Sequence, residues 1–202
     1  MRKLVLFAYA CALAIVASQA RAQQQIDIAV GASRLYSPKP LNSSLAFAPP
    51  ALTGGIYPQG SVQVIFSNHF GFNVEGTYRY NDDVYNGFQR FRPTFYEANG
   101  VYASRVTNRI RADAMVGLGG ETVFFYNQFG SCNPIYAGDC HVNANSTHLL
   151  EHVGGDLRYY FWRRVFVRPE VHFYHIQNNT NIFSSNNVLR YGASIGFSLS
   201  RQ

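Results

Sequence analysis

Residues 70–80 read Phe-Gly-Phe-Asn-Val-Glu-Gly-Thr-Tyr-Arg-Tyr, in which two kinds of side chain alternate strictly. Apolar and aromatic side chains take the even positions, with Gly76 as the exception, whereas Glu75 and Arg79 lie at odd positions. Successive side chains of a β-strand point to opposite faces of its sheet. The stretch therefore predicts a strand that has one apolar face and one face that carries charge.

The same alternation extends outward from this stretch along most of the chain. It predicts seven further strands, at residues 25–36, 56–66, 93–106, 110–125, 147–161, 165–176 and 188–199. Minimal turns join three pairs of strands, at Ser67-Asn68-His69, Thr107-Asn108-Arg109 and Trp162-Arg163-Arg164. Longer loops rich in Asn, Ser, Pro and Gly separate these hairpins, at residues 37–55, 81–92, 127–146 and 177–187.

An even number of long strands, with tight turns on one side and long loops on the other, is typical of a barrel that spans a membrane. Lipid cannot satisfy the backbone hydrogen-bonding groups of an open sheet edge, so such a sheet must close on itself. We predict an all-β fold, an eight-stranded antiparallel up-and-down transmembrane barrel. By the usual polarity of bacterial barrels, the tight turns face the periplasm and the long loops face the outside.

The first 22 residues are expected to be a secretory signal peptide. Arg2 and Lys3 precede an apolar run from Leu4 to Val16, and Ala20-Arg21-Ala22 places small residues at the two positions that signal peptidase recognises. The run of 13 is too short for a transmembrane helix, which needs about 18 residues or more. We expect residues 23–202 to form one outer-membrane barrel domain, with the cell outer membrane as its location.

The basic charge of the chain is partly a property of this leader. Its three cationic residues account for half of the formal net charge of +6, which leaves +3 on residues 23–202. The remaining basic residues are dispersed along the sequence. Nucleic-acid binding requires clustered Lys and Arg, so we expect no nucleic-acid partner.

Twelve charged side chains within the predicted strands fall on the inward parity, away from lipid. Six carboxylates and six arginines share this parity: Glu75, Glu97, Asp113, Glu121, Asp156, Glu170, Arg79, Arg105, Arg111, Arg158, Arg168 and Arg190. An eight-stranded barrel is only just wide enough for its own side chains. We therefore predict a lumen charge network of ion pairs with a structural role. The alternative is a ladder of charges that rearranges to pass small ions or a small solute.

Aromatic side chains gather at both ends of the predicted strands, as expected for two interfacial girdles. Phe66, Phe70, Phe161, Trp162 and Phe197 lie near the tight turns, and Tyr36, Tyr57, Tyr80, Phe124 and Tyr126 lie near the long loops.

Cys132 and Cys140 are the two cysteines that follow the leader, and both lie in the longest predicted loop. In an oxidising exported compartment, such a pair predicts a disulfide bond. The adjacent His141 raises a metal site as the alternative, but two thiols and one histidine form a weak zinc pattern. We predict the Cys132–Cys140 bond, with no metal site and no cofactor.

The arrangement of strands, turns and loops resembles the small bacterial outer-membrane barrels of the OmpA-like and OmpW-like kind. In the last predicted strand, Arg190, Gly192, Ile195 and Phe197 look like the signal that the outer-membrane insertion machinery recognises. The resemblance implies outer-membrane lipid and this machinery as partners. We also expect a monomer, and a possible surface ligand that binds the long loops.

Fold alone does not determine function. The leading hypothesis is a structural or surface-interaction protein without catalytic residues, accompanied by weak pore activity for small solutes. A second hypothesis is a barrel enzyme that acts on lipid or surface peptides. Candidate residues for it are His148, His152, His172, His175, Ser104 and Ser194, but their spacing indicates no nucleophile, base and orienting group. A third is a soluble lipocalin-like carrier, which the charged inward parity disfavours.

Overall fold

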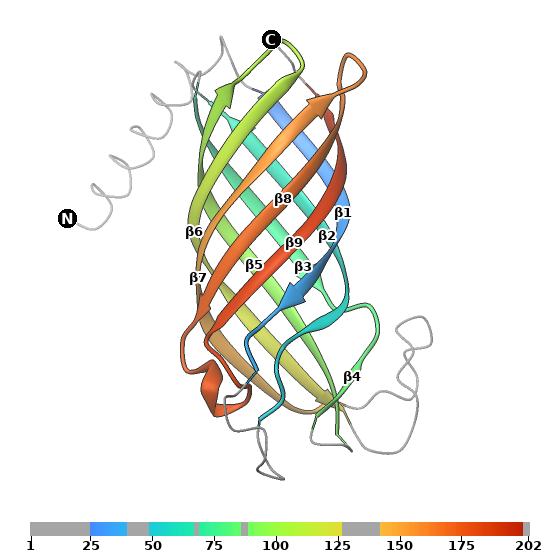
Figure 1. Cartoon of the computed structure of the whole chain (residues 1–202), viewed down its shortest axis with the longest axis vertical. Helices are drawn as coiled ribbons and strands as arrows, with labels where there is room; N and C mark the ends of the chain where they lie inside the picture. Colours follow the sequence, from blue (N-terminus) through green and yellow to red (C-terminus); the bar gives the residue numbers. More distant parts are fainter. Residues whose placement is uncertain (1–24, 40–48, 67–68, 86–88, 127–141, 200–202) are drawn as a thin grey trace, which may run out of the picture.

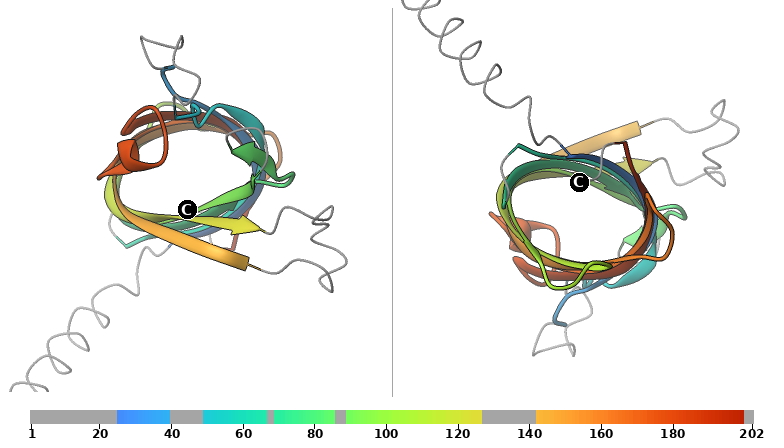
Figure 2. Two further views of the ribbon diagram at one scale, coloured as in Figure 1. Left: turned by 90° about the horizontal axis from the view of Figure 1, so that it is seen from below. Right: turned by 90° about the horizontal axis from the view of Figure 1, so that it is seen from above.

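The chain forms a closed antiparallel barrel (Figures 1 and 2). The computed structural model describes residues 25–39, 49–66, 69–85, 89–126 and 142–199. Its strands are β1 (Gln25–Tyr36), β2 (Gly54–Ile65), β3 (Phe70–Tyr78), β4 (Asp83–Tyr85), β5 (Gln89–Arg105), β6 (Ile110–Tyr126), β7 (Val142–Tyr160), β8 (Val165–Ile176) and β9 (Asn187–Ser198). A short 3₁₀ helix, η2, spans Asn179–Asn181. Among the described residues, no helix is long and apolar enough to cross a membrane.

Neighbouring strands pair in the order β3-β2-β1-β9-β8-β7-β6-β5-β4, and a further pairing between β3 and β5 closes the ring. Every pairing is antiparallel. The barrel wall therefore has eight strands, as predicted. Strand β4 is the addition: it has three residues and pairs only with the start of β5, beyond the ring.

The predicted strand positions are confirmed, and two of them, β1 and β8, match to the residue. The largest differences concern β5 and β7, which start four and five residues before their predicted positions. Strands β5, β6 and β7 have 17, 17 and 19 residues, whereas β1, β2, β8 and β9 have 12 each. The polar composition of these strand ends made them look like loop in the sequence.

Tight turns connect the strands at one end of the barrel. The backbone N–H of Val106 donates to the carbonyl of Ile110 at 3.0 Å, and that of Trp162 donates to Val165 at 3.4 Å. In the third hairpin, the N–H of Phe66 donates to Phe70 at 3.1 Å. We call this end the turn rim, and the opposite end, which carries the longer connections, the loop rim (Figure 1).

The predicted alternation is present in the wall. Along β3, odd-numbered residues are buried inside the barrel while Phe70, Phe72 and Val74 are 57%, 48% and 51% exposed on the outside. Strand β9 shows the same pattern, with outward Tyr191, Ile195 and Phe197. Burying apolar surface in lipid and charge in the lumen is the arrangement that a membrane barrel requires.

The predicted girdles need correction at two positions, Tyr57 and Tyr126. Tyr36 and Tyr80 are exposed on the outside near the loop rim, but Tyr57 is fully buried inside the barrel. Its strand places Gln59, Ser61 and Gln63 inward, and Tyr57 shares their parity. Tyr126 is also buried. Strand parity therefore predicts whether an aromatic side chain faces lipid or the lumen better than its position near a strand end does.

Candidate functional site in the barrel interior

Arg158 lies at the centre of the ion-pair cluster nearer the turn rim. Its guanidinium contacts the carboxylates of Asp27, Asp113 at 2.6 Å and Asp156 at 3.4 Å. Gln63 donates a further hydrogen bond to Asp113 at 3.0 Å. All four charged side chains are at most 2% exposed. We call this group of side chains the Arg158 cluster.

A second group, the Arg190 cluster, lies nearer the loop rim. Arg190 contacts Glu75 and lies 3.6 Å from Glu97, while Arg168 lies 2.8 Å from Glu170 and 3.4 Å from Glu75. These carboxylates and guanidinium groups come from β3, β5, β8 and β9, so the pairs cross the barrel.

The two clusters are continuous, because Arg168 also lies 3.9 Å from Asp156. Charged groups withdrawn from water are costly unless they are paired, and each charged side chain of the two clusters has a partner of opposite charge. The resulting network bridges opposite walls of the barrel.

An apolar cluster closes the interior at the loop rim, which the sequence pattern did not predict. It consists of Leu35, Leu52, Tyr57, Phe91, Phe95, Val123, Phe125, Leu150, Tyr174, Ile176, Phe183 and Val188, with Tyr85 and Ile182 packed against it. Leu52 and Phe183 come from loops and are both fully buried. We call this group the loop-rim plug.

Hydrogen bonds join the loops above this plug. The Tyr85 hydroxyl donates to the carbonyl of Ile182 at 2.7 Å, and burial raises the pKa of this hydroxyl. Ser184 donates from its backbone N–H to Pro50 at 3.1 Å and from its Oγ to Pro38 at 2.8 Å. Three separate loops are thus held together at the loop rim.

The structure places most members of the predicted lumen network inside the barrel, with three notable positions. Arg79 is buried near the loop rim, where it lies 2.8 Å from Asp83. Arg111 is partly exposed near the turn rim and donates to Gln25 at 2.6 Å. Glu121 is fully buried, and neither of its carboxylate oxygens has a hydrogen-bond partner among the described residues.

Arg105 is a wrong assignment to the lumen. It is the last residue of β5 and is exposed at the turn rim. Its position in the strand has inward parity, but it lies at the very end of the barrel wall, where the side chain is exposed.

Asp27 belongs to the network although it was absent from the predicted set. It is 2% exposed and contacts Arg158. Its inward parity with Gln25 and Ala29 was the available signal.

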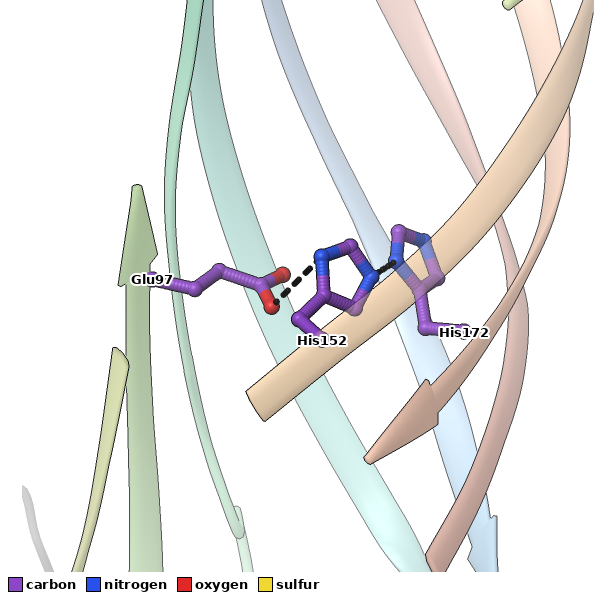
Figure 3. Close-up of side chains that lie close together, drawn as sticks. All are labelled: Glu97, His152 and His172. Atoms are coloured by element: carbon purple, nitrogen blue, oxygen red, sulfur yellow. Dashed lines mark hydrogen bonds and ion pairs between the residues drawn. The ribbon is translucent and has the colours of Figure 1, made fainter. Parts of the chain in front are cut away.

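Two buried histidines lie beside the Arg190 cluster (Figure 3). His152 Nε2 lies 2.8 Å from His172 Nδ1, and His152 Nδ1 lies 2.7 Å from Asn99 Oδ1 and 3.5 Å from Glu97 Oε2. Glu97, His152 and His172 each offer a ligand atom, and these atoms lie within 4.8 Å of one another. They are residues that could hold a metal ion, but in this geometry the ring nitrogens that face each other share a hydrogen bond.

Of the residues considered for an enzyme, His152, His172 and Ser194 lie in the lumen, where Glu170 is 3.5 Å from Ser194 Oγ and 3.7 Å from His172 Nε2. Among the described residues, no serine of this set contacts a histidine of this set. Ser194 Oγ accepts a hydrogen bond from Arg168 in the lumen, and His175 Nδ1 lies 2.8 Å from Asn187 Oδ1. The structure instead pairs His148 with Ser146, Oγ to Nε2 at 2.8 Å. The other nitrogen of His148 contacts the backbone carbonyl of Gln177 at 3.1 Å. No carboxylate contacts His148 among the described residues.

The predicted insertion signal divides between the two faces of β9. Arg190 and Gly192 lie at inward positions, whereas Ile195 and Phe197 are 50% and 43% exposed on the outside. Its recognition by the insertion machinery stays a prediction. The predicted signal peptide and the Cys132–Cys140 bond lie outside the described residues.

Comparison with known proteins identifies the fold. No protein-family model matches the sequence, and no curated protein matches it either. Among solved structures, the chain is similar to Ail, the attachment invasion locus protein of Yersinia pestis, in complex with the heparin analogue sucrose octasulfate. That match has a TM-score of 0.54 and 12% identity, and covers 88% of this chain and 99% of Ail.

Two further solved structures show the same architecture. Neisserial surface protein A matches with a TM-score of 0.57 and 11% identity over 86% of this chain and 96% of its own. A major outer membrane protein of Thermus thermophilus matches with a TM-score of 0.57 and 9% identity over 87% and 99%. The chain therefore has the fold of eight-stranded outer-membrane barrels. This fold and the apolar exterior are those of a protein of the cell outer membrane.

Proposed function

We propose that this protein is a closed outer-membrane barrel with a structural or surface-interaction role, and that it is neither a channel nor an enzyme. The observation that supports this best is the occupied interior, where the Arg158 cluster, the Arg190 cluster and the loop-rim plug follow one another along the axis. Passage of a solute would require separating buried ion pairs and displacing packed aromatic side chains. Weak pore activity, which the sequence left as a hypothesis, is therefore not part of the proposal.

The loop rim is the surface that such a barrel offers to partners. The described parts of three loops are joined by hydrogen bonds and anchored by Leu52 and Phe183, so a ligand that binds these parts would meet a surface already ordered for binding. The Ail structure includes a heparin analogue, which is a property of that protein. For this chain we propose a surface ligand without assigning its chemistry.

The two alternative functions have less support. An interior that carries seven buried carboxylates and four buried arginines among the described residues is unsuited to the apolar cargo of a lipocalin-like carrier. Among the described residues, no acidic group orients His148 of the Ser146–His148 pair as one orients the base in many hydrolases. We further propose that the barrel works as a monomer, because its strands pair within one chain.

A surface role requires the loop rim to face the outside, and Lys39 provides a direct probe of this orientation. The sequence has only two lysines, Lys3 in the predicted leader and Lys39, which is exposed at the loop rim. A membrane-impermeant amine reagent applied to intact cells is expected to label the wild-type protein. In the K39R variant the label should fall to background. The remaining amine is the α-amino group of the exported chain, which precedes the first strand, and β1 begins at the turn rim, away from the reagent.

Mass spectrometry of the recovered protein identifies the labelled residue, and lysed cells provide the reference for complete labelling. Labelling of Lys39 that appears only after lysis would place the loop rim in the periplasm and would exclude the proposed surface role.

A further inference from the structure

The exposed basic side chains of the turn rim lie together in one sector. Arg105, the last residue of β5, and Arg109 flank the β5–β6 turn, and Arg163 and Arg164 belong to the β7–β8 connection; all four are exposed. The two connections are neighbours, because the N–H of Tyr160 donates to the carbonyl of Arg109 at 2.9 Å. Figure 1 shows both hairpins at the same end of the barrel. We call these four side chains the arginine patch.

Among the described residues, the carboxylates nearest the turn rim are buried and do not lie on its surface. They belong to Asp27, Asp113 and Asp156, and Arg158 engages all three. At the loop rim, Arg79 and Arg90 lie 2.8 Å and 2.7 Å from Asp83 and Asp82, and Arg34 and Lys39 are exposed. Among the described residues, the surface of the turn rim therefore carries four exposed arginines and no exposed carboxylate.

Aromatic side chains place the arginine patch at the depth of lipid headgroups. Phe161 and Trp162 precede Arg163 directly and are 50% and 69% exposed, and Phe66 on the first hairpin is 49% exposed. Exposed Trp and Phe at a strand end mark the boundary between hydrocarbon and headgroups. A guanidinium group beside them can reach the phosphate of a neighbouring lipid.

We propose that Arg105, Arg109, Arg163 and Arg164 bind the headgroups of anionic phospholipids in the leaflet that the tight turns face. Guanidinium groups form strong, often bidentate, hydrogen bonds with phosphate oxygens. Clustered basic residues at a membrane surface recruit anionic lipids. The patch thereby fixes the depth of the turn rim and enriches anionic lipid around this sector. This inference concerns the end opposite the proposed surface site and does not depend on any loop ligand.

Trp162 allows the lipid next to the patch to be identified. It is the only tryptophan in the sequence, and it lies beside Arg163. Residues 23–202 are reconstituted in phosphatidylcholine vesicles that contain a minor, fixed fraction of phosphatidylglycerol. Bromine atoms on lipid acyl chains quench tryptophan fluorescence at short range. In one sample the phosphatidylglycerol is brominated, and in the other an equal mole fraction of the phosphatidylcholine is brominated. Quenching of Trp162 is expected to be about twofold or more stronger with brominated phosphatidylglycerol than with brominated phosphatidylcholine.

The variant with all four arginines replaced by glutamine should lose this preference. A matched control, R34Q combined with K39Q, removes two exposed basic residues at the loop rim and should keep it. High salt should weaken the preference in the wild type, because exposed charges are screened. Equal quenching of the wild type by both brominated lipids would overturn the proposal, as would an undiminished preference in the arginine variant. If that variant does not fold, the wild-type comparison and its salt dependence decide.

Discussion

Replacing Arg158 with methionine is expected to lower the free energy of unfolding by about 3–5 kcal/mol, the cost of leaving buried charges without their partner. The substitution retains much of the side-chain length but removes the guanidinium that contacts Asp27, Asp113 and Asp156. These carboxylates have no access to water from which to recover solvation. Urea unfolding in lipid vesicles, followed by the fluorescence of Trp162 and by the mobility of folded barrel on gels, measures the change.

The matched control is R109M at the exposed β5–β6 turn, and both variants are measured in vesicles without anionic lipid, so that the proposed headgroup contact of Arg109 does not contribute. Exposed substitutions away from specific contacts usually change stability by no more than about 0.5 kcal/mol. If R158M and R109M had the same effect, the Arg158 cluster would not be the tightly coupled core described above.

Replacing Val116 with arginine is expected to cost about 2–4 kcal/mol, because it places a charge on the lipid-facing surface near the middle of the membrane. Val116 is 63% exposed on the outside of β6, next to outward Ala114 and Leu118. The matched control is V106R. Val106 is 60% exposed at the turn rim, where the same charge reaches headgroups and should cost about 0–1 kcal/mol.

Both variants are compared with the wild type by urea unfolding in the same vesicles. The informative quantity is the difference between the losses of unfolding free energy at the two depths. Equal losses at positions 116 and 106 would show that the outer face of β6 does not cross the hydrocarbon region as inferred.

The wall of the barrel was predictable because lipid imposes a strong rule on sequence. Each strand must alternate apolar and polar side chains, and the eight strands, the tight turns and the inward charges follow from that period. Residues 70–80 carried this signal most clearly, and the structure has Glu75 and Arg79 inside with Phe70 and Phe72 outside.

The layers along the axis could not be predicted in the same way, because parity assigns a residue to a face but not to a depth. Tyr57 and Phe95 have inward parity like Glu97, yet they form an apolar plug instead of joining the ion pairs. Leu52 and Phe183 come from loops, where no periodic pattern indicates direction. Arg105 has inward parity but lies beyond the closed ring.

The contacts that connect distant strands were also inaccessible from the sequence. His152 and His172 meet because β7 and β8 pair in a particular register, which places His172 opposite Gly154. The arginine patch requires β6 and β7 to be neighbours, so that two turns far apart in the sequence share one sector of the rim.

The central claim is that the interior is a packed core and not a channel. Planar-bilayer recording of the purified wild-type barrel, in parallel with an open porin as positive control, tests it most directly. Recovery of folded protein from the membrane confirms that the barrel has inserted. We expect no discrete current steps above background from the inserted barrel. Reproducible, stepwise currents whose size scales with the number of inserted barrels would contradict the claim.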